Sequence, residues 1–148
     1  MDAESAIRGM VDRETAAWDR QDAATLVELF HPDMVWPWPP DEHGHDPITW
    51  ILPMGRFDAE RWQASWQELF DTHELVRNRR TTQRIAVTPE GDGGFAVVDI
   101  DTEWRNRADG AVQRWFGRVC KVYSLVDGEW KLTMHTGALD YGSVRRAV

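Results

Sequence analysis

The sequence predicts an α+β domain in which helices come first and an antiparallel sheet follows. Two observations lead to this class. Apolar residues recur at helical spacing in three segments of the N-terminal half, whereas strand-like alternation and turn signals fill the chain from residue 81 onward. The 148 residues contain no internal repeat and no low-complexity segment, so we expect a single domain over residues 1–148.

The first predicted helix covers residues 4–20, and a short second helix follows Asp22, a residue type that favours the N-cap position. Pro32 is expected to end this second helix. A third helix is predicted over residues 59–75, with Asp58 as its N-cap. Residues expected on the inward faces of these helices are Ile7, Met10, Val11, Glu14, Trp18, Leu26, Leu29, Phe30, Trp62, Trp66, Leu69 and Phe70.

The remaining segments favour strands and turns. The dipeptide Asp127-Gly128 is a hairpin signal between the last two strands. The stretch MVWPWPPDEHGHDPITW, residues 34–50, contains four prolines, which exclude a central strand and favour a stiff loop after its first residues. Strands are predicted at residues 34–36, 81–88, 95–105, 111–126 and 129–139.

Charge and composition exclude several classes of function. With 17 basic and 25 acidic residues the net charge is −8, which disfavours binding to nucleic acid or to an anionic membrane surface. No segment is apolar enough for a membrane span, and the first residues do not resemble a signal peptide. The single cysteine, Cys120, excludes an internal disulfide framework, and we expect a cytoplasmic protein.

Two charged patterns are interpreted as surface features. Arg77, Arg79, Arg80 and Arg84 form a basic run that is typical of the solvated face of one segment. The alternating carboxylates of Asp99, Asp101 and Glu103 favour the outer face of a strand, with Arg105 or Arg118 as partners. A role of these carboxylates in acid–base chemistry or cation binding is the alternative.

Three stretches of the sequence carry a resemblance to a known superfamily. They are AAWDRQDAATLVELFHPDMVW, GRFDAERW and VYSLVDGEWKLTMHTG, with the spaced run D-x-x-x-L-x-x-L-F-x-P-D and the hairpin D-G-x-W-K-L as the most recognisable marks. In these motifs and in the order of its elements, the chain resembles the nuclear transport factor 2-like superfamily, which includes SnoaL-like polyketide cyclases and ketosteroid isomerases. The resemblance implies a cystatin-like cone, in which a curved antiparallel sheet wraps three helices around a pocket, and a homodimer formed through the sheet.

The resemblance does not extend to the catalytic residues of the ketosteroid isomerases. At the positions that correspond to that family's tyrosine, general base and proton-donating aspartate, this sequence has Glu14, Trp38 and Lys121. None of the three matches the family, so the isomerase mechanism is not supported. Because the superfamily contains isomerases, cyclases, dehydratases and non-catalytic modules, the fold alone does not define a function.

Glu14 and Lys121 are candidate ionisable residues of the pocket. Glu14 interrupts the apolar stripe of the first helix and is either a general acid or base projecting into the cone or a residue at the edge of the stripe that reaches water. Lys121 lies among large apolar residues of a strand. It could bind an acidic substrate, pair with Glu14, or extend its amine out to solvent.

Two further side chains are candidate assistants in catalysis. Simple alternation directs His135 away from Trp130 and Leu132, which favours the sheet interface slightly over the pocket. Tyr123 shares the strand face of Lys121. Cys120 is interpreted as structural, since no nucleophile motif surrounds it or any serine.

The sequence favours a tryptophan-lined pocket without metal or cofactor. His43 and His45 form an H-x-H flanked by carboxylates, but no third histidine has a fixed spacing to them, so a polar loop tip is favoured over a metal site. We expect a small hydrophobic or aromatic ligand and cofactor-free isomerisation, cyclisation or dehydration, with a non-catalytic ligand-sensing or assembly module as the alternative. Among nine tryptophans, the expected ligand contacts are Trp18, Trp36, Trp38, Trp50, Trp66, Trp104 and Trp115.

Overall fold

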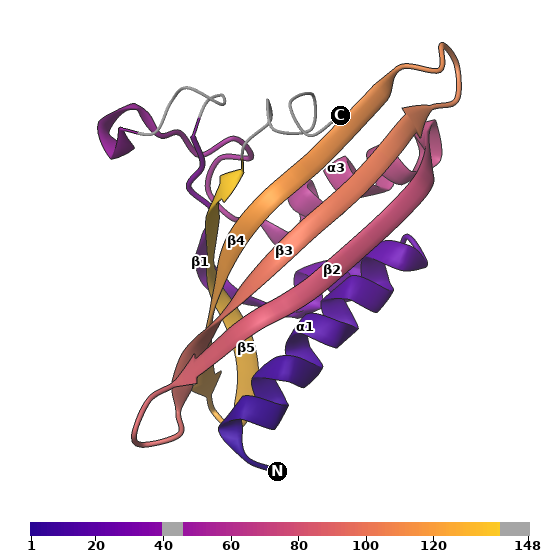
Figure 1. Cartoon of the computed structure of the whole chain (residues 1–148). Helices are drawn as coiled ribbons and strands as arrows, with labels where there is room; N and C mark the ends of the chain where they lie inside the picture. Colours follow the sequence, from indigo (N-terminus) through magenta and orange to yellow (C-terminus); the bar gives the residue numbers. More distant parts are fainter. Residues whose placement is uncertain (40–45, 140–148) are drawn as a thin grey trace.

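A computed structural model describes residues 1–39 and 46–139, and these residues form three helices, one short 3₁₀ turn and five strands. Figure 1 shows the strands β2, β3 and β4 as long neighbouring ribbons with helix α1 beside them. The elements are α1 (Ala3–Asp19), α2 (Ala23–Glu28), β1 (Phe30–Val35), η1 (Pro47–Thr49), α3 (Ala59–Thr72), β2 (His73–Val87), β3 (Gly93–Asn106), β4 (Val112–Val126) and β5 (Glu129–Leu139).

The sheet has the strand order β1-β5-β4-β3-β2. The pairs from β2 to β5 are antiparallel neighbours in sequence, as predicted, and the α+β class is confirmed. The prediction of a wholly antiparallel sheet is wrong at one edge, because β1 pairs with β5 in parallel. Strand β1 also begins earlier than expected and includes Pro32, which an edge strand tolerates because one side of its backbone has no strand to pair with.

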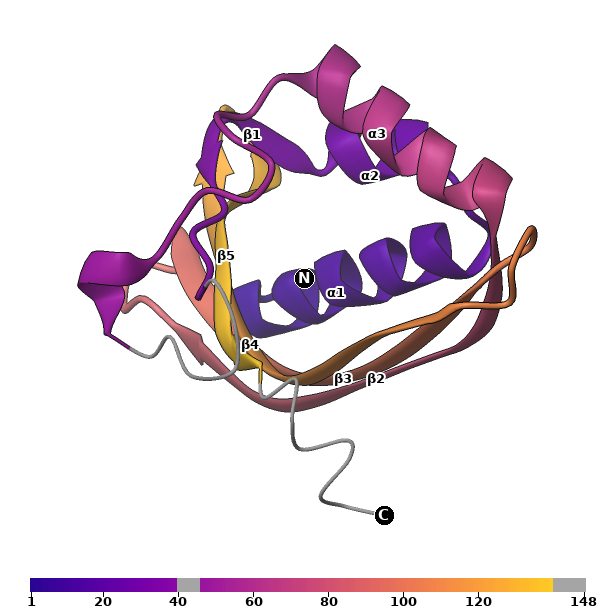
Figure 2. The ribbon, with the colours of Figure 1, turned by 90° about the horizontal axis from the view of Figure 1, so that it is seen from above.

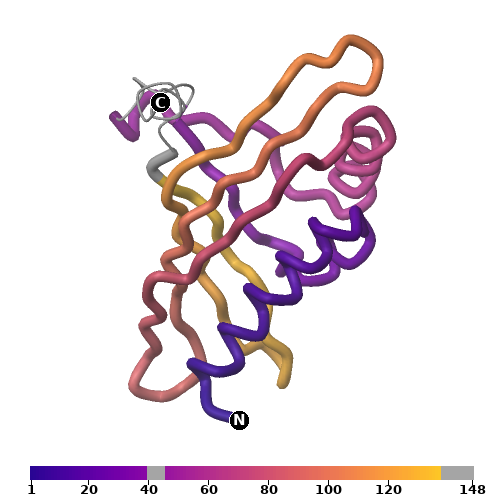
Figure 3. Tube along the Cα trace, turned by 45° about the vertical axis from the view of Figure 1, so that its right-hand side comes forward, coloured from indigo at the N-terminus to yellow at the C-terminus, as the bar shows by residue number. Residues whose placement is uncertain are grey.

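The sheet curves around helix α1. Figure 2 shows α1 lying across the concave face of the sheet, between strands β2 and β3 on one side and helices α2 and α3 on the other. Figure 3 shows α1 running along β2. Helix α1 approaches the sheet closely at Gly94 of β3, where an added Cβ atom would lie 2.9 Å from Ile7 Cδ1 and would also clash with the backbone oxygen of Ala86. The absence of a side chain at Gly94 therefore lets the first half of α1 pack directly on the sheet.

Aspartate side chains cap the N-terminus of each α-helix. Asp22 accepts a hydrogen bond from the amide of Thr25 at 3.0 Å, and Asp58 accepts one from the amide of Arg61 at 2.8 Å, which confirms both predicted N-caps. Asp2 does the same for α1. Each carboxylate accepts from an amide that the helix leaves unsatisfied, so the caps fix where the helices begin.

The boundary between α3 and β2 differs from the prediction. The helix ends at Thr72 instead of residue 75, and His73 already has an extended backbone with φ −127° and ψ 147°. Strand β2 begins there instead of at residue 81, since residues 73–80 pair with β3, for example Leu75 with Trp104. Pairing with a neighbouring strand overrides the helical spacing of the apolar residues at this point.

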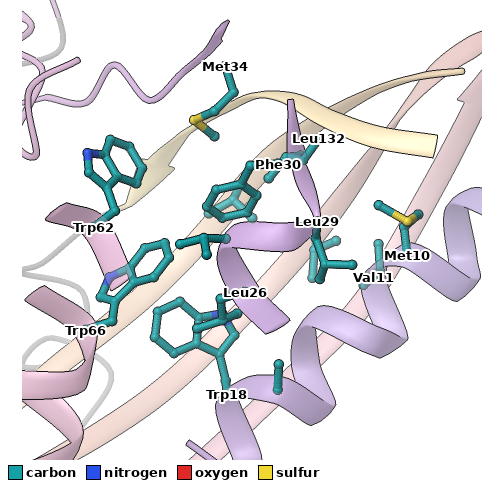
Figure 4. Packing of buried hydrophobic residues seen from close by; sticks show 14 of the residues in the cluster. Met10, Val11, Trp18, Leu26, Leu29, Phe30, Met34, Trp62, Trp66 and Leu132 are labelled. Atoms are coloured by element: carbon teal, nitrogen blue, oxygen red, sulfur yellow. The ribbon is translucent and has the colours of Figure 1, made fainter. Parts of the chain in front are cut away.

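The core contains a cluster of aromatic rings between the helices and the sheet. In Figure 4, Trp18 of α1, Trp62 and Trp66 of α3 and Phe30 of β1 point toward one another. The ring of Trp66 lies edge-on to Trp18, with centroids 5.1 Å apart, and edge-on to Phe30 at 5.7 Å. None of the helices in the described part of the chain is both long and apolar enough to cross a membrane.

Candidate functional site

A pocket of about 260 Å³ lies where α1, α3, the concave face of the sheet and the segment after β1 meet. Most of its surface is aromatic or aliphatic, and its ionisable residues are Glu14, Arg80 and His135. The complete lining is Glu14, Trp18, Trp36, Trp38, Pro39, Ile51, Pro53, Met54, Trp66, Arg80, Ile100, Trp115 and His135.

A larger surface groove of about 930 Å³ lies elsewhere, between α2, β1 and the β4–β5 turn. Its charged residues are Arg13, Glu28, Glu129 and Lys131, of which the first three are exposed. Lys131 pairs with Glu129 at 3.4 Å and donates to the backbone oxygen of Glu28. The groove therefore lacks the buried ionisable groups that chemistry requires. The smaller pocket is the candidate site because buried polar groups converge on it.

The rings of five tryptophans form the walls of the pocket. Trp18 lies edge-on to Trp115 at 5.5 Å, and Trp36 lies 5.9 Å from Trp66. Trp38 is held by two backbone hydrogen bonds with Ile51, of 2.9 and 3.0 Å, so the proline-rich segment forms one wall. These rings present both faces and edges to a ligand, which suits a flat aromatic molecule.

Glu14 is buried and held by three cationic or polar partners. Both of its oxygens accept hydrogen bonds from Lys121 Nζ at 2.9 Å, and Oε2 also accepts from Trp18 Nε1 at 3.1 Å. The guanidinium of Arg80 is 3.5 Å from the same oxygen. Burial alone would raise the pKa of Glu14, but the charges of Lys121 and Arg80 outweigh it and lower the pKa below 4.5. Glu14 is therefore an anion, and the alternative in which it reaches water is wrong.

Lys121 is 1% exposed at its side chain and pairs with Glu14, one of the alternatives that the sequence left open. Burial lowers the pKa of Lys121, and Glu14 opposes that shift. The ammonium also lies 3.2 Å from Nδ1 of His135. Because an ammonium only donates, Nδ1 accepts this hydrogen bond and the neutral imidazole carries its proton on Nε2.

His135 faces the pocket, so the interpretation that placed it at the sheet interface is wrong. A β-bulge causes the difference: Tyr123 pairs with Leu132 and Val122 with Met134, which leaves Thr133 as an extra residue in β5. His135 therefore shares a face with Leu132. Its ring stacks on Trp38, with centroids 5.3 Å apart and an interplanar angle of 12°, and lies 3.8 Å from the ring of Trp36.

The surroundings of His135 keep its imidazole neutral. Burial, followed by the positive charges of Lys121 and Arg80, lowers the pKa of His135 well below 6.5. A neutral imidazole with a proton on Nε2 can donate a hydrogen bond to a ligand, while Lys121 supports it from the other side. The site can therefore hold or move a proton along the line from Glu14 to Lys121 to His135.

Arg80 is the residue of this site that sequence reasoning missed. The basic run was interpreted as a solvated face, but the side chain of Arg80 is only 4% exposed. It donates from Nε to Asn78 at 2.9 Å, and its guanidinium lies over the ring of Trp18 at 5.5 Å. A predicted strand that began at residue 73 would have placed Asn78 and Arg80 on one face, because side chains alternate along a strand, and Arg77 and Arg79 on the other face.

Four predicted site residues lie outside the pocket lining. Lys121 is one of them and reaches the pocket only through Glu14 and His135. Trp104 is fully buried behind the wall, with its ring 5.7 Å from that of Trp115. Tyr123 is also buried, its hydroxyl has no hydrogen-bond partner within the described residues, and burial raises its pKa well above 10. Trp50 caps the short 3₁₀ turn and does not contribute to the lining. His43 and His45 lie outside the described residues.

The outer face of the sheet carries a second set of ion pairs. Asp99 pairs with Arg118 at 2.7 Å, and Arg77 contacts both Asp101 and Glu103 at 2.9 Å. Glu103 also pairs with Arg114 at 2.8 Å. The predicted partner Arg118 is confirmed, whereas Arg105 pairs with Glu74 instead because these two face each other across β2 and β3.

Within residues 1–39 and 46–139, no group of three or more histidine, cysteine or acidic side chains could hold a metal ion. Cys120 is half-buried, and burial raises the pKa of its thiol, which makes the thiolate scarce at neutral pH. The ionisable groups of the described site are the carboxylate of Glu14, the ammonium of Lys121, the guanidinium of Arg80 and the imidazole of His135.

Solved structures with the same fold cover most of the chain. A ketosteroid isomerase-like protein from Erwinia carotovora atroseptica is 14% identical, has a TM-score of 0.69, and covers 92% of this chain and 95% of its own. A conserved protein from Planctomyces limnophilus is 19% identical, with a TM-score of 0.71 and coverage of 92% and 94%. A scytalone dehydratase-like protein from Novosphingobium aromaticivorans is 14% identical, with a TM-score of 0.65 and coverage of 89% and 80%.

At these identities the structural likeness shows the fold alone, and this fold is the one that the sequence resemblance implied. No protein with a curated description matches the chain in sequence. The sequence profile of the SnoaL-like domain matches residues 1–136, which is nearly the whole chain. By this match, the chain belongs to the SnoaL-like domain family.

Proposed function

We propose that this protein binds a small aromatic or hydrophobic molecule in the tryptophan-lined pocket and changes it by cofactor-free proton transfer. One observation carries the proposal. Residues far apart in the sequence, Glu14 of α1 and Lys121 and His135 of the sheet, form one buried hydrogen-bonded line that ends at the pocket wall. A buried polar line is costly to maintain, and such lines concentrate at functional sites.

The roles of the three groups follow from their charges. His135 donates its Nε2 proton to a ligand oxygen, while Lys121 passes a proton from Nζ to Nδ1. Imidazole is then again neutral, with the opposite tautomer, and Lys121 is a neutral amine. Lys121 regains its proton when Nε2 takes a proton back from the ligand and Nδ1 returns its own to Nζ. The lowered pKa of Lys121, which burial causes, makes this donation easier, and Glu14 holds the ammonium in place. Isomerisation, cyclisation and dehydration all require such a proton at an oxygen.

The scytalone dehydratase-like neighbour supports an enzymatic reading by analogy of fold. A second function, non-catalytic ligand binding, is favoured by a different observation. Both oxygens of Glu14 are occupied by Lys121, and its lowered pKa makes the carboxylate a weak base. In that case the same pocket senses a ligand without turning it over.

The two functions are separated by a binding screen followed by proton exchange. Aromatic polyketides and steroids are screened by thermal shift, since a ligand at a hundredfold excess over its Kd stabilises the fold by about 2.7 kcal/mol. Each ligand that binds is then incubated in D₂O, and NMR follows the exchange of its C–H protons next to carbonyl groups. Catalysis predicts exchange or product above the solvent rate, at least about tenfold lower in His135→Ala.

The control for this experiment is Arg118→Gln on the outer face, which should exchange the ligand at the wild-type rate. Ligands that bind without exchange or product would support the sensing function. A chain that no member of the screen stabilises would contradict both functions.

A further inference from the structure

The charges around the pocket do not balance. Two buried cations, Arg80 and Lys121, share a single buried carboxylate, Glu14, and the side chains of the three are 4%, 1% and 3% exposed. Two positive charges and one negative charge leave a net charge of +1. His135 does not change this sum, because its imidazole is neutral.

A further carboxylate that acts on Arg80, that of Asp19, lies on the surface. Asp19 accepts a hydrogen bond from Asn78 Nδ2 at 2.9 Å, and Asn78 in turn accepts from Arg80, so the amide lies between the two and the Asp19 charge acts on Arg80 from a distance. Asp19 is exposed to solvent, which screens its field. A buried charge without a full counter-charge is costly, and a site that keeps one is suited to a ligand of opposite sign.

Of the two cations, Arg80 is the one with hydrogen-bond donors left for a ligand. Lys121 places its ammonium on both oxygens of Glu14 and on His135, whereas Arg80 reaches Glu14 only at 3.5 Å and spends its Nε on Asn78. A guanidinium has five N–H donors, and Arg80 is part of the pocket lining. Its remaining donors have the fork geometry that pairs with a carboxylate in a bidentate manner.

The size and walls of the pocket restrict the rest of the ligand. A cavity of about 150 Å³ accommodates a benzene molecule, so the 260 Å³ here has room for one or two rings and a small polar group. Five tryptophans provide the faces and edges for such rings. We propose that the pocket takes a small aromatic carboxylate, with its ring between the tryptophans and its anionic group on Arg80. This inference rests on the proposed function, because it names the class of ligand for the same pocket.

Calorimetry with one matched pair of probes tests the inference. 2-Naphthoate and its neutral isostere 2-naphthamide have the same ring and nearly the same shape, so their affinities differ by the charge alone. Wild-type protein is expected to bind the acid at least about tenfold more tightly than the amide. In Arg80→Gln this preference should fall to less than about threefold through loss of the acid's affinity, and Arg80→Lys should keep part of it.

The matched control is Arg79→Gln, which removes the same charge from the preceding residue of β2, whose side chain is exposed on the outer face of the sheet. It should keep the tenfold preference. Equal affinity for acid and amide in the wild type would overturn this inference and leave the proposed function intact. Binding of neither probe would overturn this inference, and the steroid and polyketide screen would then decide the proposed function. The wild-type comparison needs no variant, so it remains decisive if Arg80→Gln fails to fold.

Discussion

The two faces of one sheet use the same ionic side chains in different ways. On the outer face, Asp99, Asp101 and Glu103 meet Arg77, Arg114 and Arg118, three carboxylates and three guanidiniums whose charges sum to zero. On the inner face, the group of Glu14, Arg80 and Lys121 has a net charge of +1. The outer arginine side chains are 28–61% exposed, whereas the inner three side chains are at most 4% exposed.

The difference separates a group whose charges are matched from one whose charges are not. Solvent reaches the outer arginines and screens their pairs, although Glu103 itself is only 7% exposed. Each outer carboxylate already has its counter-charge. The inner group is far from solvent, and its interactions are stronger because the surroundings screen them less. Its charges also do not cancel, and the group borders the pocket. Its net positive charge can therefore attract a ligand of opposite charge.

The largest expected effect is on the inner carboxylate. Glu14→Gln leaves Lys121 and Arg80 buried without an anion, and we expect the free energy of unfolding to fall by roughly 3–5 kcal/mol in urea titrations. The outer counterpart Asp101→Asn should cost at most about 1 kcal/mol, because the side chains of Asp101 and Arg77 are each 28% exposed.

A second variant checks the cause of this loss. Glu14→Leu combined with Lys121→Met removes one charge of each sign and leaves one buried cation, Arg80, without an anion instead of two, so it should regain part of the stability that Glu14→Gln loses. If Glu14→Gln and Asp101→Asn cost the same, the distinction between the two faces is wrong.

The next effect is on the dependence of stability on pH. Because burial, Lys121 and Arg80 lower the pKa of His135 well below 6.5, the unfolded chain binds a proton below pH 6.5 that the folded chain does not. Stability should therefore fall as pH decreases from about 6.5, with a slope of up to about 1.4 kcal/mol per pH unit from this residue. His135→Asn should flatten the curve between about pH 6.5 and pH 5.

Glu14 adds a separate, more acidic limb to the same curve. Its pKa is lowered in the folded state, so its contribution is complete above the ordinary pKa of 4.5 and is lost as pH falls through the folded value. His73→Asn, which replaces a histidine at the start of β2 away from the buried group, is the control for the upper limb and should keep the wild-type slope. An unchanged slope in His135→Asn would show that the imidazole is not held neutral.

Local signals in the sequence predicted much of the fold. The aspartate caps at Asp22 and Asp58 and the turn at Asp127-Gly128, where both residues have positive φ, depend on a few neighbouring residues and appear as expected. The extension of β2 back to His73 could not be read in this way. It depends on pairing with β3, which is a contact between distant segments.

The site was less accessible to sequence reasoning for the same reason. The ion pair between Glu14 and Lys121 joins residues 107 positions apart, and it was foreseen only as one of several alternatives. One extra residue in β5, Thr133, reverses the face on which His135 lies, and no local pattern marks that bulge. Arg80 was predicted to lie in solvent because the basic run was treated as one surface. In a strand, Arg79 and Arg80 point to opposite faces.

The smallest expected effect is at the outer pair of Asp99 and Arg118, and salt sharpens its contrast with the inner pair. A double-mutant cycle of Asp99→Asn and Arg118→Gln should show a weak coupling that disappears near 1 M salt, where the screening length is about 3 Å. The cost of Glu14→Gln should persist at the same salt concentration, because buried pairs only 2.9 and 3.5 Å apart are screened much less than exposed ones. A coupling at Asp99 and Arg118 that survives high salt would mean that this face is covered in solution. The homodimer through the sheet that the family resemblance implies would then be the first arrangement to examine, by sedimentation at several protein concentrations.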